Sequence, residues 1–113
     1  MSEQAVFDAL KYHIEVDMRG TRWYRNSMGQ LHRDYGPAVE YSNGDELWYH
    51  NDQLHRENGP AIVCTNGHKE WWQNGQRHRT DGAAVELSDG DKWWFINGVR
   101  LTEAEFNQAI KSL

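Results

Sequence analysis

The central part of this sequence repeats itself every 23 residues, and this period constrains the fold more than any other feature. The segment LHRxxGPA begins at Leu31 and again at Leu54, and a degraded copy, RHRTDGAA, begins at Arg77. Three glycines and three tryptophans keep the same step: Gly44, Gly67 and Gly90, and Trp48, Trp71 and Trp94. A fixed period of roughly 20–50 residues is typical of repeat proteins, in which each unit is one supersecondary element stacked on the next.

Each unit has the pattern of two strands. Apolar residues alternate in the first stretch, at Val39, Ile62 and Val85 and again at Tyr41, Cys64 and Leu87. This period of two predicts a strand with one buried face. The strand ends at Asn43-Gly44, Asn66-Gly67 or Asp89-Gly90, where we expect type I′ hairpins. A second turn follows at Asn51-Asp52, Asn74-Gly75 and Asn97-Gly98.

These patterns predict a mainly β fold, an antiparallel meander of about four 23-residue β-hairpin repeats with about eight to ten short strands. We expect a single domain over residues 1–113, with the β-repeats over 14–101. An earlier copy, Trp23-Tyr24-Arg25-Asn26, aligns its tryptophan with Trp48 and carries two extra residues, which suggests a longer loop at Ser27-Met28.

Both ends depart from the repeat, as the ends of arrays do. Residues 1–13 predict an N-terminal helix with Ser2 as its N-cap. Residues 102–113 predict a C-terminal capping helix, because Thr102 and Glu105 have the spacing of a capping box. In the last unit, Leu101-Thr102 replaces the His-Arg pair of the other units.

Two aromatic columns follow from the return strands, since adjacent residues of a strand point to opposite faces. The uniform column of Trp48, Trp71 and Trp94 is predicted to be packed, with Trp71 largely buried. The variable column of Tyr49, Trp72 and Phe95 is predicted to be partly exposed. Cys64 aligns with Tyr41 and Leu87, which predicts a buried, inert thiol.

Composition limits the partners. The formal net charge is −5, which disfavours nucleic acid and anionic membranes and favours a basic partner. We find no stretch apolar enough to cross a bilayer and no signal peptide. One cysteine permits no internal disulfide. Together these features predict a cytoplasmic protein.

The His-Arg pairs, His32-Arg33, His55-Arg56 and His78-Arg79, admit two interpretations. They could form a ladder of donors for phosphate or carboxylate groups, with His32, Arg33, His55 and His78 as phosphate-binding candidates. The interpretation we favour is structural. Each His would pack beneath a Trp and bond a backbone carbonyl, and each Arg would pair with Asp34, Glu57 or Glu40 or stack on an aromatic ring.

Catalysis and metal binding have no support in the sequence. Two strands per unit at roughly 4.8 Å place successive column histidines about 10 Å apart, too far to share one ion. The acidic residues form no recognisable acid–base pair, and no nucleophile motif or phosphate loop is present. We therefore expect no enzyme activity, no metal site and no cofactor.

The pattern WYxNGxxHRxxGPA resembles MORN-variant repeats, which occur in antitoxin-like bacterial proteins and in arrays of large tailed bacteriophages. The resemblance covers about Trp23 to Phe106. It implies a meandering antiparallel sheet that serves as a binding scaffold without shared catalytic residues. Ala83, which replaces the proline, and Leu101-Thr102 depart from the pattern.

The favoured function is a non-catalytic module that binds a protein partner. Given the resemblance, it could be a phage accessory factor that neutralises a host protein in the host cytoplasm. Aromatic and Arg side chains dominate interface energetics, so the candidates for partner binding are Tyr49, Trp72, Arg56 and Arg79. A binder of phosphorylated ligands or nucleotides is the first alternative, and a structural protein that forms homo-oligomers is the second.

Overall fold

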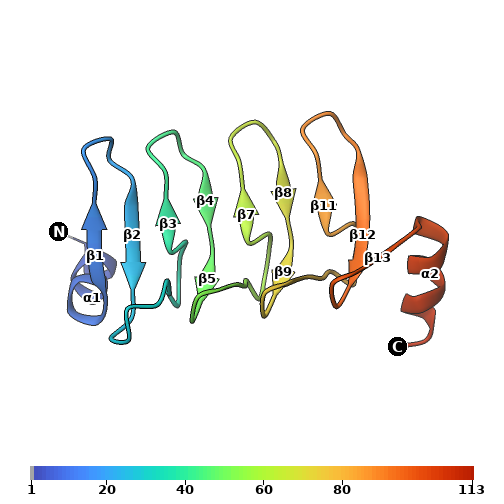
Figure 1. Cartoon of the computed structure of the whole chain (residues 1–113), viewed down its shortest axis with the longest axis horizontal. Helices are drawn as coiled ribbons and strands as arrows, with labels where there is room; N and C mark the ends of the chain where they lie inside the picture. The colour runs from blue at the N-terminus through green and yellow to red at the C-terminus, as the bar shows by residue number, and fades with distance from the viewer. Residues whose placement is uncertain (1) are drawn as a thin grey trace.

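The computed structural model describes residues 2–113, and Met1, the first residue of the predicted N-terminal helix, lies outside the described residues. The fold is mainly β, with an antiparallel sheet of hairpins and one helix at each end, as predicted (Figure 1). The molecule is elongated, 48 × 29 × 22 Å. Its hairpins follow one another along the longest axis.

The described residues form two helices and thirteen strands. The helices are α1 (Glu3–Lys11) and α2 (Glu103–Lys111). The strands are β1 (His13–Val16), β2 (Arg22–Arg25), β3 (Val39–Glu40), β4 (Glu46–Leu47), β5 (Tyr49–His50), β6 (Gln53–Leu54), β7 (Ile62–Val63), β8 (Lys69–Glu70), β9 (Trp72–Gln73), β10 (Gln76–Arg77), β11 (Val85–Glu86), β12 (Lys92–Ile96) and β13 (Val99–Leu101).

Nine of the strands form one sheet with the order β1-β2-β3-β4-β7-β8-β11-β12-β13. The pairs β5-β6 and β9-β10 form two small sheets beside it. The described strands outnumber the expected eight to ten because the return strand breaks at Trp48 and Trp71. Trp48 donates its amide to Ala61 in the main sheet, while its carbonyl accepts from His55 in the small hairpin. The chain therefore changes neighbours at each of these tryptophans.

The two sets of turns differ in type. Both residues have positive φ at Asn74-Gly75 and Asn97-Gly98, as a two-residue type I′ turn requires, and Asp52 takes the glycine's place at Asn51-Asp52. The prediction of type I′ turns at the other set is wrong. There only the glycine has positive φ, and the loop has three residues, as at Ser42–Gly44 between the bonded Tyr41 and Asp45. The Asn43 side chain accepts from the Asp45 amide and stabilises this wider turn.

Both helix starts are as predicted. The Ser2 side chain accepts from the amide of Ala5. Thr102 and Glu105 form the complete capping box. Neither helix is long and apolar enough to cross a membrane, among the residues described.

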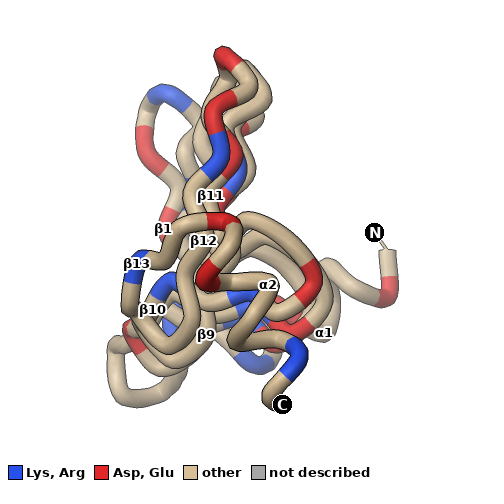
Figure 2. Tube along the Cα trace, turned by 90° about the vertical axis from the view of Figure 1, so that its right-hand side faces the viewer, with Lys and Arg blue, Asp and Glu red and all other residues tan. Residues whose placement is uncertain are grey.

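The core lies inside the lower part of the array, where the chain curls back below the thin blade of hairpin tips (Figure 2). Ala38, Ala61 and Ala84, one per unit, are completely buried. Val39 and Val85 are almost completely buried in the main sheet.

The predicted contrast between the aromatic columns is wrong. Trp48, Trp71 and Trp94 are half-buried, as are Tyr49 and Trp72, whereas Phe95 is buried in a cluster with Ala84 and Val85. Trp71 keeps most of its surface buried, as predicted, and the stacked Arg79 covers one face of its ring. Cys64 is half-buried rather than buried, and burial still raises the pKa of its thiol.

The alignment of the earliest copy is off by one residue. Tyr24, and not Trp23, occupies the place of Trp48. Its carbonyl accepts from the His32 amide, and its ring carries Arg33, as the Trp48 ring carries Arg56. One extra residue then suffices, since the loop Ser27–Gly29 between the bonded Asn26 and Gln30 has three residues where the next unit has two.

Candidate binding surface

Each histidine of the His-Arg pairs fastens one unit to the next. The Nδ1 atom of His32 accepts a hydrogen bond from the amide of Asn51 at 3.0 Å. His55 and His78 accept from Asn74 and Asn97 in the same way, both at 2.9 Å. These amides belong to the type I′ turns, so each histidine holds a tight turn in place. The expected bond to a carbonyl is wrong, because the partner is a donor.

This geometry determines the tautomer. A backbone amide only donates, so each Nδ1 must be the unprotonated nitrogen and Nε2 must carry the proton. Nε2 of His32 lies 2.8 Å from Asp34, and Nε2 of His55 lies 2.6 Å from Glu57. His78 has no such acceptor among residues 2–113, because Thr80 follows where the other units have an acid. Both ring nitrogens of His32 and His55 are therefore engaged within the chain.

Each arginine of the pairs stacks on the aromatic ring of its own unit. The guanidinium carbons of Arg33, Arg56 and Arg79 lie 3.9, 3.7 and 3.7 Å from the ring centroids of Tyr24, Trp48 and Trp71. Nη1 of each donates to a carbonyl four residues on, that of Pro37, Pro60 or Ala83. A Cβ at Gly36 would lie 2.8 Å from the Arg33 guanidinium, which explains the glycine of the repeat.

The three arginines differ in their ion pairs. Arg33 pairs with Asp8 at 2.7 Å and with Glu40 at 3.6 Å. Arg79 pairs with Asp81 at 2.7 Å and with Glu86 at 3.2 Å. Arg56 has no carboxylate within 4.0 Å of its guanidinium in the described chain. Burial lowers the pKa of this guanidinium, and the charge of Glu46 acts in the opposite direction. Arg56 is thus the one stacked arginine of the column that forms no ion pair among the described residues.

Two hollows open along the central units. The first has a volume of about 590 Å³ and is lined by Arg33, Asp34, Tyr35, Trp48, Tyr49, His50, His55, Arg56, Glu57 and Asn58. The second has about 800 Å³ and is lined by Arg56, Glu57, Asn58, Gly59, Pro60, Trp71, Gln73, Asn74, His78, Arg79, Thr80, Asp81 and Asn97. The wall between them consists of Arg56, Glu57 and Asn58.

The two hollows are the same site one unit apart. Every lining position of the first hollow except Tyr49 recurs, 23 residues later, in the lining of the second. The equivalent of Tyr49 is Trp72, whose ring nitrogen donates instead to Glu70 at 3.0 Å. The repeat therefore produces a row of matching hollows along one side of the array.

The structure brings most of the predicted site residues to these hollows. Tyr49 lines the first, Arg79 the second, and Arg56 both. Of the phosphate-binding candidates, Arg33 and His55 line the first hollow and His78 the second. Trp72 and His32 line neither of these two hollows.

Asp34 is a meeting point of hydrogen bonds beside the first hollow. Lys11 at the end of α1, Tyr12 directly after it, and His32 all donate to its carboxylate. The bond from Lys11, followed by those from Tyr12 and His32, lowers the pKa of Asp34 from 3.8 to about 2, against the opposing effect of burial. Asp34 ties the N-terminal helix to the first unit.

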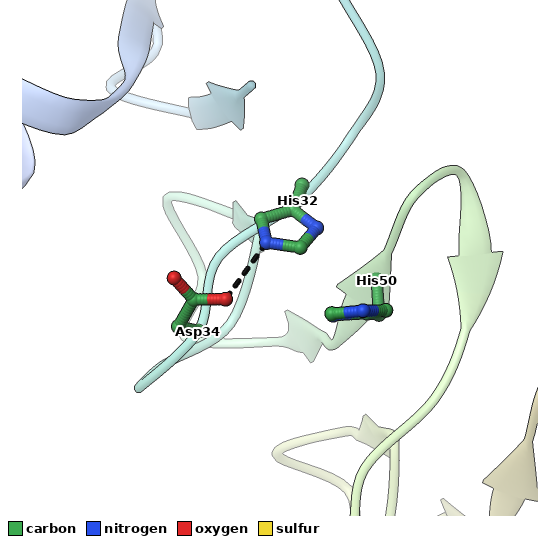
Figure 3. A group of neighbouring side chains, drawn as sticks. All are labelled: His32, Asp34 and His50. Atoms are coloured by element: carbon green, nitrogen blue, oxygen red, sulfur yellow. Dashed lines mark hydrogen bonds and ion pairs between the residues drawn. The ribbon is translucent and has the colours of Figure 1, made fainter. Parts of the chain in front are cut away.

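His50 lies against this group and was not anticipated as a site residue. Its ring centroid is 4.4 Å from that of His32 and 5.9 Å from that of His55. Burial, and then the charges of His32 and His55, lower the pKa of His50. Figure 3 shows its ring facing His32 across from Asp34. The repeat pattern did not point to His50, because this residue lies outside the column of His32, His55 and His78.

Candidate ligand atoms of His32, Asp34 and His50 lie within 4.8 Å of one another, a spacing that a metal ion could bridge. The hydrogen bonds argue against such a site. Nδ1 of His32 accepts from Asn51, so Nε2 carries a proton and has no lone pair for a metal. Asp34 already accepts from three donors. This trio therefore fits a hydrogen-bonded cluster better than a metal centre.

A buried acid in the main sheet also escaped the sequence analysis. Glu70 occupies the position of Leu47 and Trp93 in neighbouring units, and its side chain is 11% exposed. Burial alone would raise the pKa of Glu70, but hydrogen bonds from Arg77, His68 and Trp72 outweigh it and lower the pKa. Its partners occupy every oxygen, so Glu70 is structural.

Comparison with family models, with curated proteins and with solved structures finds no match to this chain. The resemblance to MORN-variant repeats therefore rests on the sequence motif alone. Function has to follow from the two hollows and the side chains that line them.

Proposed function

We propose that the protein is a non-catalytic β-repeat interaction module that holds an extended segment of a protein partner along its row of hollows. The observation that carries the proposal is the recurrence of one lining, 23 residues apart, in two adjoining hollows. A repeated surface suits a repeated ligand, and a polypeptide backbone is the repeated ligand that proteins meet most often. Enzymes, in contrast, gather unlike residues at one point.

The spacing of the hollows supports a peptide ligand. One unit adds two strands to the sheet, so neighbouring hollows are about 10 Å apart. A segment in the polyproline II conformation covers about the same distance in one turn of three residues, at about 3.1 Å per residue. Every third side chain of such a segment lies on the same side and would enter a new hollow.

The lining also has the character of a protein-binding surface. The volumes lie within the roughly 300–1,000 Å³ of ligand sites. Trp48, Trp71, Tyr49 and the stacked arginines are of the residue types that dominate interface energetics. Stacking of Arg56 on Trp48 and of Arg79 on Trp71 already holds these side chains in place, which reduces the entropy lost on binding.

The resemblance stated above suggests the setting. A phage-encoded array of this kind would act in the host cytoplasm and neutralise a host protein. This phage setting rests on the resemblance of the sequence motif alone.

A binder of phosphorylated ligands remains the second candidate. The observation that favours it is that Arg56, which lacks a carboxylate, and the unbonded Nε2 of His78 line the same hollow. The engagement of both ring nitrogens in His32 and His55 disfavours it. A nucleotide stacked on Trp71 would quench tryptophan fluorescence, whereas a peptide without aromatic residues would not.

Tyr49 and Trp72 provide a matched pair of variants. The two residues share a column, but only Tyr49 lines one of the two hollows. We expect Tyr49→Ala to lose the partners captured from a host lysate and identified by mass spectrometry, and Trp72→Ala to keep them. Thermal unfolding and size-exclusion chromatography would verify that both variants are folded and in the same oligomeric state. Equal capture by both variants would show that the first hollow is not the surface.

A further inference from the structure

We infer that Arg56 is the docking point for a carboxylate side chain on the partner's bound segment. The inference rests on the proposed function and names the chemistry of the partner. The net charge of −5 favours a basic partner as a whole, but Arg56, in the wall between the two hollows, makes no ion pair with a carboxylate of the described residues.

The flanking units show what this position binds. Arg33 and Arg79 stack on their rings as Arg56 does, and each donates to the equivalent carbonyl. Each also pairs with two carboxylates of this same chain. Arg33 has Asp8 at 2.7 Å from Nη2 and Glu40 at 3.6 Å from Nη1. Arg79 has Asp81 at 2.7 Å from Nε and Glu86 at 3.2 Å from Nη1. The same guanidinium, in the same setting, thus takes a carboxylate wherever the chain supplies one.

Two substitutions in the repeat remove the internal partners at the middle unit. Glu40 and Glu86 stand seven residues after Arg33 and Arg79, and both reach back to these arginines. The seventh residue after Arg56 is Val63. Asn58 likewise stands where Asp81 pairs with Arg79, so both carboxylates are replaced by uncharged residues at once.

Arg56 remains available to a ligand. The Trp48 ring covers one face, and Nη1 donates to the Pro60 carbonyl at 3.0 Å. Nε and Nη2 make no hydrogen bond within residues 2–113, and the residue lines both hollows. These two nitrogens form the edge that binds a carboxylate with two parallel bonds. Stacking holds the guanidinium still, so little side-chain entropy is lost when the pair forms.

A carboxylate fits better than a phosphate. Glu57 lines both hollows next to Arg56, and its side chain is 75% exposed beside His55. Asp34 lines the first hollow and Asp81 the second. A doubly charged phosphate would be repelled by these acids more strongly than a singly charged carboxylate.

The array itself suggests the decisive variant. Val63→Glu restores the acid of the flanking units and should satisfy Arg56 from within, as Glu40 satisfies Arg33. Val63→Gln has the same shape without the charge and is the matched control. Equivalent positions already hold Glu in two folded units, so both variants should fold.

The measurement is a titration with an oligoglutamate peptide, followed by NMR of the arginine side-chain Nε–H signals. We expect the Arg56 signal to move in the wild type and in Val63→Gln, while the Arg33 and Arg79 signals stay in place. Val63→Glu and Arg56→Gln should each weaken binding about tenfold, as the loss of one charge-assisted contact does.

Several outcomes would overturn the inference. These are no movement of the Arg56 signal in the wild type, equal binding by Val63→Glu and Val63→Gln, and a stronger response to inorganic phosphate than to oligoglutamate. Failure of the proposed function is distinguishable, because it would leave the oligoglutamate titration intact while the wild type captures no protein partner. Conversely, capture that Val63→Glu leaves unchanged would refute the role of Arg56 alone.

Discussion

The structural role of a residue in this array depends on contacts with the neighbouring units. His32, His55 and His78 each accept a hydrogen bond from an amide of the following turn, 19 residues later in the chain. The sequence suggested that these residues build the unit, since they recur in each intact copy. It could not reveal the donor, because the bond joins positions whose distance depends on how the return strand breaks at Trp48.

The first prediction concerns the tautomers of these histidines. All three should be neutral Nε2–H forms near pH 8, because Nδ1 receives the amide hydrogen. Long-range proton–nitrogen NMR spectra distinguish the two nitrogens directly. A histidine found as the Nδ1–H tautomer would contradict the bond drawn here, and solvent-exposed His13, which makes no such bond, is the reference.

The second prediction concerns Asp34 and pH. Its folded-state pKa of about 2 lies below the ordinary 3.8, so the ionised carboxylate stabilises the fold above pH 3.8, and this contribution is lost as pH falls to about 2. Asp34→Asn should lower the free energy of unfolding by about 1–2 kcal/mol at neutral pH, with the difference from wild type vanishing near pH 2. Chemical denaturation across this range would measure it.

Glu57 is the control for this experiment because it holds the equivalent position one unit later. It accepts only from His55, and its side chain is 75% exposed. Glu57→Gln should change stability by well under about 1 kcal/mol at any pH. Equal pH dependence in both variants would show that the contacts from Lys11 and Tyr12 do not matter.

At the scale of elements, the small sheets depend on contacts with the main sheet. Arg77 of β10 donates to Glu70 of β8 at 2.9 Å and lies over the Trp72 and Phe95 rings. The preceding unit has Leu47 and Leu54 at these two positions. Equivalent positions thus hold an ion pair in one unit and two leucines in the unit before it.

The third prediction is a double-mutant cycle on this pair. Arg77→Leu alone should destabilise the protein by about 1–2 kcal/mol, because it leaves a buried carboxylate with fewer donors. Glu70→Leu and Arg77→Leu together copy the preceding unit and should return stability to within about 1 kcal/mol of the wild type. Thermal unfolding measures all four proteins. Additive losses would mean that the two residues act independently.

The elements also show where sequence reasoning succeeds and where it stops. Alternation and capping motifs predicted the sheet, its antiparallel hairpins and both helices, because these signals are local. The turn at Asn43-Gly44 misled, since an Asn-Gly pair fits both a type I′ turn and a three-residue loop that ends in a left-handed glycine. The contrast in burial between the two aromatic columns was misjudged, because the repeat pattern does not reveal which side chain covers a ring, as Arg79 of the next segment covers Trp71.

The sequence did not predict the hollows, although it did indicate several of the residues that line them. Arg56 was a candidate from its type alone. Its special state, a stacked cation without a carboxylate, depends on Val63 being seven residues away and yet close in space. Such a relation becomes visible only when the equivalent pairs, Arg33–Glu40 and Arg79–Glu86, are seen in contact.

At the scale of the whole molecule, stability is expected to be a sum of units and of contacts between neighbours. The fourth prediction follows. Removal of residues 55–77 joins Leu54 to His78 in the same relation as Leu54 to His55, so the shortened chain should fold. Its free energy of unfolding should fall by about 1–3 kcal/mol, the share of one unit. Circular dichroism and denaturant titration measure both properties.

Removal of residues 55–74 is the matched control, because it deletes fewer residues but breaks the register of the repeat. It should give an unfolded or aggregated chain. If the shorter deletion folded as well as the longer one, the 23-residue step would not govern the packing.

The histidine bonds all run from one unit to the next and never backwards, which gives the array a head and a tail. The Asn97 amide donates to His78, but Leu101 stands where the next histidine would be, so the series ends there. At the head, Tyr12 and Asp8 beside the first unit take the place of a preceding one. The residues that repeat are therefore distinct from those that end the array. Duplication of one internal unit would extend the row of hollows by about 10 Å and leave both ends unchanged.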